Sequence, residues 1–319
     1  MNITALGWYD HGNIGDEAYK IAFPKIFPSH KFTFTDVLQN DCECVFLGGG
    51  DVLQKYFLEQ LKKTKIPKYA MSVNIGCQDV NLYIHLFKQC FVRNLCPTTD
   101  TMLSVADFAF VLEACPEQGK KIIKRLFQEN KADLYDRVII IVLNAYLCSS
   151  ENSLARDHIN FDKVCYDLAR IMDNTPASFL LLPFGNGFPH NDRLASSALY
   201  TKCKYWKKNV LLYKELSVQG TLDVVSAANM MIGSRLHASI FSCIGGTPFI
   251  DLTHHNKTAL FLESINKDWS VNYWNFNNER LKALMSDFQT NEQFYKEDLL
   301  GIAKKNRDLL LDLPNRLKL

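Results

Sequence analysis

Short apolar runs alternate along the chain with longer stretches in which apolar positions recur at helical spacing. This alternation is typical of β–α–β units, in which helices join parallel strands. Two of the runs, VIIIVL at 138–143 and SFLLLP at 178–183, are apolar almost throughout, as expected of strands buried on both faces. The pattern therefore predicts an α/β fold made of two Rossmann-like, doubly wound domains that face a cleft.

The first half of the chain is predicted to hold strands at 3–7, 44–48, 69–75 and 106–112. Helices are expected at 16–23, 51–63, 82–91 and 116–128. A second alternating series follows. Its strands are expected at 138–144, 178–183, 210–213, 230–233 and 248–252, and its helices at 161–172, 192–200, 222–228 and 236–244.

The polar segment ENKADLYDR at 129–137 is the expected hinge between the two domains. We therefore expect an N-terminal Rossmann-like domain at 1–130 and a C-terminal one at 131–290. The charged, helical tail at 291–319 is expected to pack back across the domains.

The composition excludes several classes of protein. The 319 residues include 36 Lys or Arg and 34 Asp or Glu, and the net charge of +2 gives no argument for nucleic acid or an anionic membrane. Hydrophobic residues make up 47% of the chain, which excludes a mainly disordered protein. No stretch reaches the roughly 18 apolar residues of a membrane helix, and the N-terminus lacks the basic region of a signal peptide, so we expect a cytoplasmic protein.

The ten cysteines are spread through apolar segments, which favours buried, reduced thiols over a disulfide framework. Cys42 and Cys44 form a C-x-C, but no second Cys or His pair stands at the spacing of a zinc site. The H-E-x-x-H sequence of zinc proteases does not occur either. We therefore expect no metal site.

The loop after the first predicted strand carries Gly12, Asn13, Gly15, Asp16 and Glu17. Its glycines permit close approach of a ligand, and the N–H groups at the start of the following helix favour an anion or a sugar hydroxyl. The glycine spacing is not that of a dinucleotide-binding loop, and the Lys-Ser/Thr of a Walker loop is missing. An ordinary strand–turn–helix cap explains the same residues, so both interpretations stay open.

Three glycines at 48–50 directly follow another predicted strand. The backbone at Gly49 and Gly50 therefore lies close either to a ligand or to a neighbouring helix. Arg93 precedes a further predicted strand, and it is either a ligand-binding cation, a surface charge or a partner of Asp107.

The strongest candidate is Ser234-Arg235-Leu236-His237, where a predicted strand ends and a helix begins. A cation in the first turn of a helix opposes the helix dipole, which indicates that an anion lies between them. The alternative is a helix whose Arg235 and His237 merely face solvent or the other domain.

Two weaker candidates follow other predicted strands. His190 stands in a glycine-rich loop, and Lys257 comes soon after the strand at 248–252. Ligands of parallel α/β sheets bind outside the carboxyl ends of the strands, where both residues are expected. An ordinary polar loop explains each of them equally well.

Together these motifs resemble those of the polysaccharide pyruvyl transferase family. The resemblance rests on the opening at 12–17, the glycines at 48–50, Arg93 ahead of ADFAF at 106–110, Arg235-Leu236-His237, the G-x-P at 246–248 and Lys257. It implies a GT-B-like arrangement of two Rossmann-like domains, with the acceptor side and Arg93 in the first and the donor side in the second. The implied reaction moves pyruvate from phosphoenolpyruvate onto a sugar diol and gives a cyclic ketal.

The resemblance also implies roles for single residues. Arg93 and Arg235 hold the carboxylate and phosphate of phosphoenolpyruvate, since two guanidiniums bind them bidentately. His237 protonates the methylene carbon, and Asp16 accepts the proton of the attacking hydroxyl or orients the sugar. The other expected ligands are Ser234, Leu236 and Lys257 for the donor, and Gly12, Asn13, Gly15, Glu17, Gly49, Gly50 and His190 for the acceptor. Phosphoenolpyruvate is the co-substrate, and no metal or further cofactor is required.

Two other functions are compatible with the same residues. A GT-B glycosyltransferase would hold the diphosphate of a nucleotide sugar with residues 233–237 and the turn at 245–246, and Asp16 would be its base. A non-catalytic glycan-binding protein would keep the fold without turnover. The expected partner is in each case a glycan or saccharide, and contact with a membrane-borne glycan would be peripheral.

Overall fold

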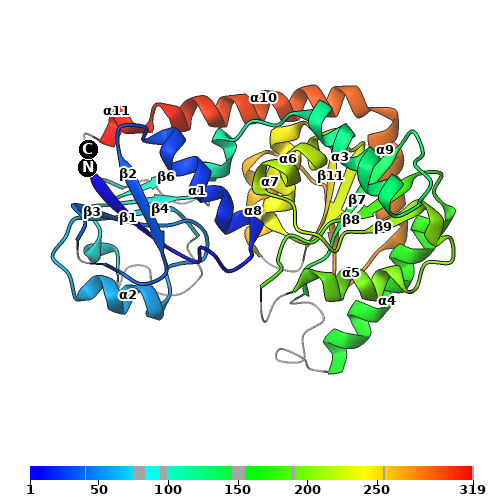
Figure 1. Cartoon of the computed structure of the whole chain (residues 1–319), viewed down its shortest axis with the longest axis horizontal. Coiled ribbons are helices and arrows are strands. Elements are labelled where there is room, and N and C mark those ends of the chain that lie inside the picture. Colours follow the sequence, from blue (N-terminus) through cyan, green and yellow to red (C-terminus); the bar gives the residue numbers. More distant parts are fainter. Residues whose placement is uncertain are drawn as a thin grey trace. The chain divides into compact units, whose positions relative to one another are not determined.

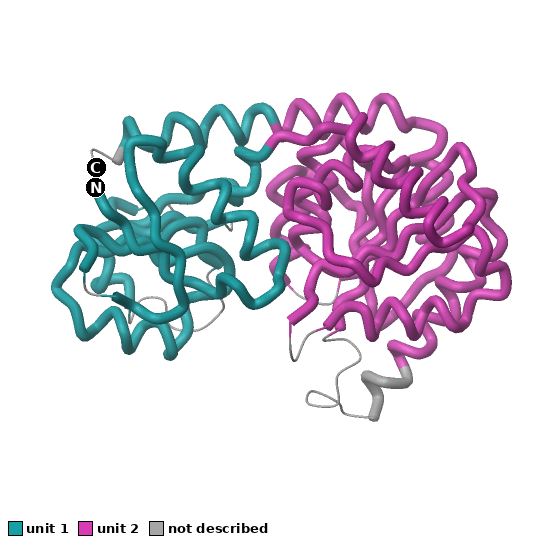
Figure 2. Tube along the Cα trace, in the orientation of Figure 1, with its two compact units in different colours: residues 1–112, 304–319 teal, residues 113–303 magenta. Residues whose placement is uncertain are grey.

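Figure 1 shows the computed structural model of the chain, which divides into two compact units (Figure 2). Unit 1 comprises Met1–Leu112 and Lys304–Leu319, and unit 2 comprises Glu113–Ala303. The structure describes residues 1–39, 41–74, 83–93, 99–145, 155–187, 191–253 and 256–317.

Unit 1 is built on a parallel sheet of six strands in the order β2-β1-β3-β4-β5-β6. The strands are β1 (Asn2–Leu6), β2 (Lys31–Thr35), β3 (Cys44–Leu47), β4 (Lys68–Val73), β5 (Gln89–Val92) and β6 (Met102–Ser104). From β1 the chain runs outward to β2 on one side, and then to β3, β4, β5 and β6 on the other. The sheet is therefore doubly wound, with its topological switch point between β1 and β3.

The helices of unit 1 pack an aromatic core onto this sheet. Tyr19 and Phe23 lie on the buried face of the first helix, and the ring of Phe23 lies 5.8 Å from that of Phe46 in β3. Such aromatic contacts add stability beyond the area that they bury. The described helical segments are α1 (Ile14–Ile26), α2 (Lys55–Lys62), the 3₁₀ turns η2 (Ile84–Leu86) and η3 (Phe108–Val111), and α11 (Leu313–Leu317).

Unit 2 is built on a second parallel sheet of six strands in the order β12-β11-β10-β7-β8-β9. The strands are β7 (Val138–Val142), β8 (Ser178–Leu181), β9 (Asn209–Leu211), β10 (Met230–Gly233), β11 (Phe249–Thr253) and β12 (Ser270–Asn272). From β7 the chain runs outward to β9, returns to β10 beside β7, and runs outward again to β12. This sheet is also doubly wound, with its switch point between β7 and β10, and the predicted fold class is confirmed.

Helices cover this second sheet (Figure 1). They are α3 (Pro116–Glu129), α4 (Ala155–Asn174), α5 (Asp192–Tyr200), η6 (Trp206–Lys208), α6 (Val218–Ala227), α7 (Leu236–Gly245), α8 (Asn256–Ser264) and α9 (Asn278–Thr290). The long helix α10 (Glu292–Leu311) contributes residues up to 303 to unit 2 and the rest to unit 1.

Helix α3 belongs to unit 2 because it packs tightly against α6. A Cβ atom at Gly119 would lie 1.9 Å from the carbonyl oxygen of Asp223, so only glycine allows this approach. The Asp223 carboxylate also accepts a 2.8 Å hydrogen bond from the backbone N–H of Cys115. The boundary between the units therefore lies at 112/113, ahead of α3, and not behind it at 130/131 as the sequence suggested.

Two expected elements of unit 1 are wrong. The segment 106–112 forms the turn η3 and not a strand, because Asp107 caps it by accepting a 2.9 Å hydrogen bond from the N–H of Ala109. A buried apolar run this short fits either structure. The helix expected at 82–91 is replaced by η2 and, from residue 89, by strand β5.

The sequence pattern gives no indication of three short strands, β2, β6 and β12. Each lies at an edge of its sheet. An edge strand is covered on fewer sides than a central one, so it has no continuous apolar run, and the sequence KFTFT of β2 alternates instead.

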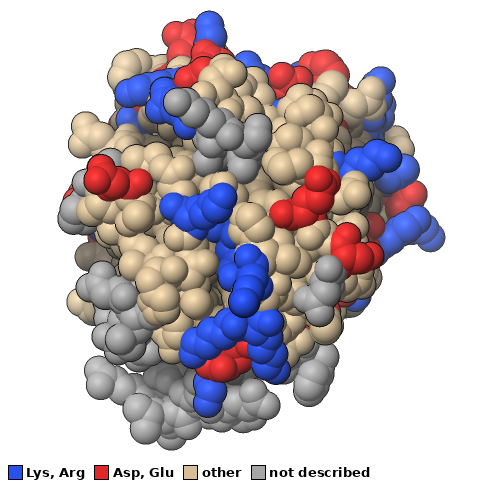
Figure 3. Space-filling model, turned by 90° about the vertical axis from the view of Figure 1, so that its left-hand side faces the viewer, with Lys and Arg blue, Asp and Glu red and all other residues tan. Residues whose placement is uncertain are grey.

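Three cysteine side chains, the surface charges and the helices can be compared with what the composition predicts. Burial raises the pKa of Cys44, Cys90 and Cys203 to about 12, so these thiols stay protonated. On the face seen in Figure 3, a run of basic side chains passes down the middle, and acidic side chains lie to either side. None of the described helices is long and apolar enough to cross a membrane.

Candidate functional site

The motifs singled out in the sequence lie at the switch points of the two sheets. In unit 1 residues 12–17 span the end of the loop after β1 and the first turn of α1, and the loop after β3 contains residues 48–50. In unit 2 the loop after β10 contains Ser234 and Arg235, next to the loop after β7. Ligands of doubly wound sheets bind at such points, so each unit presents a candidate ligand-binding edge.

The loop before α1 is shaped by its own polar side chains. Asn13 caps α1, since its Oδ1 accepts a 3.0 Å hydrogen bond from the N–H of Gly15. Glu17 accepts a 2.6 Å hydrogen bond from the N–H of Asp10, which has a left-handed backbone with φ 63°, and Gly12 has φ 71°. Asn13 and Glu17, both expected to bind an acceptor, therefore also hold the loop in place.

The three glycines after β3 have different neighbours. A Cβ atom at Gly49 would lie 1.9 Å from Cζ of Tyr19 in α1, so this glycine makes room for the helix. Gly50 has φ 89°, and a Cβ atom there would lie 3.3 Å from Oδ1 of Asp16. The structure thus brings Asp16, the expected catalytic acid–base residue, side by side with Gly50, an expected acceptor residue.

Arg93 follows β5 and lies in a buried cluster of polar groups. Its Nη1 donates a 3.1 Å hydrogen bond to Oδ2 of Asp107, and its Nη2 lies 3.6 Å from Oδ1 of Asp51. Asn74, at the end of β4, donates a 2.7 Å hydrogen bond to the same oxygen of Asp51, and Tyr19 donates one of 2.8 Å to Asp107. The pairing of Arg93 with Asp107, one of the interpretations open from the sequence, is present.

The charges of this cluster support one another. Burial alone would lower the pKa of Arg93, but Tyr19, Asp107 and Asp51 raise it above the ordinary value, so Arg93 stays charged. Only 5% of its side chain is exposed. Its buried Nε–H has no hydrogen-bond acceptor among the described atoms.

In unit 2, the end of β10 is fixed by Ser234. Its hydroxyl accepts a 2.9 Å hydrogen bond from the N–H of Asn144, and its own N–H donates to the carbonyl oxygen of Val142, also at 2.9 Å. Arg235 follows as the N-cap residue of α7, with extended backbone. The buried Ser234 therefore ties the ends of β7 and β10 together beside Arg235.

The guanidinium of Arg235 is bound by a fully buried carboxylate. Its Nε donates a 3.0 Å hydrogen bond to Oδ2 of Asp192, and its Nη2 donates one of 2.6 Å to Oδ1. Asp192 is the first residue of α5 and is 0% exposed. The sequence pattern placed residue 192 only at the start of the helix expected at 192–200, although an acid directly at a helix start behind a strand end was the available signal.

The other expected donor residues lie in the first turns of two helices. Leu236 and His237 begin α7, where Leu236 is buried and His237 is half-buried, and the half-buried Lys257 lies in the first turn of α8. A basic residue therefore stands near each helix start. His190, expected to bind an acceptor, lies outside the described residues.

A buried carboxylate supports these helix starts from below. Asp251 of β11 accepts a 3.1 Å hydrogen bond from the hydroxyl of Ser239 in α7 and a 3.0 Å bond from that of Thr253. Burial raises the pKa of Asp251 to about 6, although these hydroxyl groups partly offset the effect.

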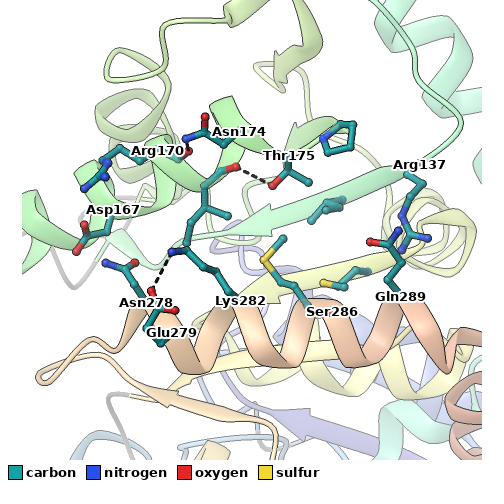
Figure 4. A pocket seen from close by; sticks show the side chains of 15 residues that line it. Arg137, Asp167, Arg170, Asn174, Thr175, Asn278, Glu279, Lys282, Ser286 and Gln289 are labelled. Carbon is teal, nitrogen blue, oxygen red and sulfur yellow. Dashed lines mark hydrogen bonds and ion pairs between the residues drawn. The ribbon is translucent and has the colours of Figure 1, made fainter.

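A separate hollow of about 560 Å³ lies in unit 2 between α4 and α9 (Figure 4). It opens near the starts of β7 and β10, at the edge of the sheet opposite to Arg235, and Ile139 and Met230 form its buried floor. Its rim mixes both charges, since Lys282 pairs with Glu279 at 2.9 Å. This hollow contains none of the expected site residues and favours neither an anion nor a cation.

The two ligand-binding edges differ in their chemistry. That of unit 1 carries the carboxylates of Asp16 and Asp51, which are typical hydrogen-bond acceptors for sugar hydroxyls. That of unit 2 carries Arg235 and His237 at the N-terminus of α7, an arrangement that binds anions.

Comparisons with known proteins agree with this geometry. A sequence profile of the family described as polysaccharide pyruvyl transferase matches residues 11–256 of the chain. A search of curated proteins finds no match. The match to the profile confirms the resemblance that the motifs suggested.

Solved structures that hold UDP-sugars share the fold. UDP-GlcNAc 2-epimerase from Neisseria meningitidis, bound to UDP-GlcNAc, matches with a TM-score of 0.65 and 11% identity over 99% of this chain and 100% of that chain. Anabaena Alr3699/HepE in complex with UDP-glucose matches with a TM-score of 0.63 and 8% identity, over 99% of this chain and 100% of that chain. At such low identity these likenesses show the fold alone, which is GT-B-like.

Proposed function

Because the chain belongs to the polysaccharide pyruvyl transferase family, we propose that it transfers pyruvate from phosphoenolpyruvate to a glycan diol and forms a cyclic ketal. The observation that carries the proposal is the anion-binding arrangement of Arg235 and His237 at the N-terminus of α7. Phosphoenolpyruvate is a small trianion with a carboxylate and a phosphate close together, and it suits such a site.

The proposed binding of the donor uses hydrogen bonds that the protein leaves open. Arg235 donates to Asp192 from Nε and Nη2, and its Nη1 has no partner among the described residues. We assign this outer part of the guanidinium to the donor, together with the N–H groups of the first turn of α7. Arg93 is the second guanidinium that the family resemblance implies for the donor. Lys257 adds a further cation.

The proposed reaction has two steps: the first sugar hydroxyl adds to the donor, and the second replaces its phosphate. His237 gives a proton to the methylene carbon of phosphoenolpyruvate, and the neighbouring carbon becomes an oxocarbenium-like centre. The first sugar hydroxyl adds to that carbon, and Asp16 takes its proton. The second hydroxyl then replaces the phosphate and gives its proton to the deprotonated His237, which closes the cyclic ketal. The phosphate leaves as hydrogen phosphate with the proton that Asp16 took up. The proposed reaction needs no oxidant or reductant, so it requires no redox cofactor. Cations of the protein neutralise the charge of the donor, so the proposal assigns that task to no metal ion.

The acceptor is assigned to the switch point of unit 1. The Asp16 carboxylate lies beside the Gly50 backbone, and Asp51 directly follows this glycine. Two partly exposed carboxylates beside a backbone turn are suited to bind neighbouring hydroxyls of a sugar. Asp51 and Asn74 are additions to the acceptor residues expected from the sequence.

A glycosyltransferase that uses a nucleotide sugar is the second candidate. It is favoured by the similar solved structures, two of which hold UDP-GlcNAc and UDP-glucose. The N-terminus of α7 would then bind the diphosphate, and Asp16 would serve as the base.

The test is to incubate the protein with phosphoenolpyruvate and a simple diol, methyl galactoside or methyl mannoside, or with a bacterial polysaccharide extract. Phosphorus NMR follows the release of inorganic phosphate, and mass spectrometry detects the carboxyethylidene group on the sugar. Phosphate release that depends on the glycan supports the proposal. Transfer of hexose from a UDP-sugar, with phosphoenolpyruvate untouched, would replace it with the second candidate.

A further inference from the structure

We infer that Asp192 is a positioning residue, which fixes the guanidinium of Arg235 in the orientation that receives the donor anion. The inference rests on the proposed function in one respect, namely that Arg235 binds the donor. Asp192 itself does not touch the substrate in this account.

The geometry of the ion pair determines which part of Arg235 remains open. Nε and Nη2 form one edge of the planar guanidinium, and both donate to the two oxygens of Asp192, at 3.0 and 2.6 Å. The edge formed by Nη1 and Nη2 is left facing away from Asp192. A two-oxygen anion such as a carboxylate or phosphate binds end-on to that edge, with two parallel hydrogen bonds.

Asp192 cannot turn to follow the arginine, because its oxygens are held from the backbone. Oδ1 accepts a 2.8 Å hydrogen bond from the N–H of Ala145. Oδ2 accepts bonds of 3.2 and 2.7 Å from the N–H groups of Phe184 and Gly185. These groups follow β7 and β8, so the carboxylate is anchored to two strand ends and dictates where Arg235 points.

The pair therefore contributes orientation and not net charge. The charge of Asp192 formally cancels that of Arg235. The anion instead binds to hydrogen-bond donors that are already oriented, so the Arg235 side chain loses little conformational freedom on binding. A lysine at position 235 would keep the charge but lose the fixed edge.

The first test is Asp192→Asn in the full-length protein. The amide keeps the size of the carboxylate but turns one acceptor into a donor that faces N–H groups. We expect the dissociation constant for phosphoenolpyruvate, measured by calorimetry, to rise about tenfold to hundredfold, as typical for loss of hydrogen bonds to a charged group. In turnover, KM for phosphoenolpyruvate should rise while kcat changes less. The double variant with Arg235→Ala should bind no more weakly than Arg235→Ala alone.

A matched control separates positioning from general stability. Asp223 is also a buried aspartate of unit 2 whose carboxylate accepts a hydrogen bond from a backbone N–H, but it belongs to α6 and bonds to Cys115 at the start of α3. Asp223→Asn should lower the melting temperature without a change in phosphoenolpyruvate affinity. If Asp192→Asn and Asp223→Asn lose affinity equally, or if Asp192→Asn binds as tightly as the wild type, the inference is wrong.

Two further measurements keep the inference testable on their own. Phenylglyoxal modification, read by peptide mass mapping without any ligand, should become faster at Arg235 in Asp192→Asn and stay unchanged in Asp223→Asn. This readout tests whether Asp192 fixes the guanidinium of Arg235 even if the wild type binds no phosphoenolpyruvate and the proposed function fails, and unchanged labelling of Arg235 in Asp192→Asn would contradict the inference. Should Asp192→Asn not fold, Arg235→Lys replaces it: affinity as low as in Arg235→Ala supports orientation, and affinity near that of the wild type contradicts it.

Discussion

The buried carboxylate of Asp251 makes a sharp prediction about the pH dependence of stability. Asp251 is fully buried beneath α7 and α8, and burial raises its pKa from 3.8 to about 6. Between these two values the folded protein holds the proton more tightly than the unfolded chain does. The free energy of unfolding therefore falls as the pH rises through this range.

The magnitude follows from the size of the shift. A difference of about 2 pKa units, at 1.36 kcal/mol per unit, corresponds to about 3 kcal/mol of stability that is present below pH 3.8 and lost above about pH 6. Asp251→Asn has no proton to release. The stability of the wild type minus that of Asp251→Asn should thus fall by about 2–3 kcal/mol between about pH 4 and about pH 7.

The assay is urea unfolding at a series of pH values, followed by tryptophan fluorescence. Trp269 is buried in unit 2, which also contains Asp251, so its emission reports on the correct unit. Asp136→Asn is the control, since this side chain is exposed in the same unit. Stability curves of wild type and Asp251→Asn that run parallel across the pH range would refute the reasoning.

Three other substitutions test the site. Gly49→Ala should lower the free energy of unfolding by about 1–3 kcal/mol, because its Cβ would lie 1.9 Å from Cζ of Tyr19. An unchanged urea midpoint would contradict that contact. Asp16→Asn should lower kcat about 100-fold while the calorimetric affinity for phosphoenolpyruvate stays the same, and a loss of donor affinity instead would move Asp16 out of the acceptor site. His237→Gln should lower kcat by about 100-fold or more, and wild-type kcat in this variant would exclude His237 as the proton donor.

The architecture was predictable from the sequence because the central strands are nearly continuous apolar runs. The run at 138–143 contains β7, and 230–233 coincides with β10, so both strands at the switch point of unit 2 were found. The wrong predictions lie where an apolar run is compatible with both a strand and a short helical turn. The buried run at 106–112 is apolar like a strand, but the cap formed by Asp107 turns it into η3.

The site was predictable only as far as single motifs reveal it. Arg235 and His237 stood out because basic residues at a helix start are unfavourable without an anion. Asp192, the partner of Arg235, lies 43 residues away in the sequence, and only the fold brings the two together. The same holds for Arg93 and Asp51, since neither strand order nor side-chain direction can be read from the spacing of the residues.

The glycines at 48–50 show how one motif can combine two roles. The sequence allowed either a ligand or a neighbouring helix beside them. Gly49 lies against Tyr19 of α1, whereas Gly50 lies against the Asp16 carboxylate at the proposed acceptor site. One of two neighbouring glycines therefore allows helix packing and the other lies at the candidate site. The sequence cannot distinguish these roles, because both residues are glycine.

The most direct test of the central claim is a calorimetric titration of wild type, Arg235→Ala and Arg235→Lys with phosphoenolpyruvate and with uridine diphosphate. We expect the wild type to bind phosphoenolpyruvate and not uridine diphosphate, and both variants to bind it at least about tenfold more weakly. Binding of uridine diphosphate alone, or wild-type affinity for phosphoenolpyruvate in Arg235→Ala, would contradict the assignment of α7 as the site for this donor.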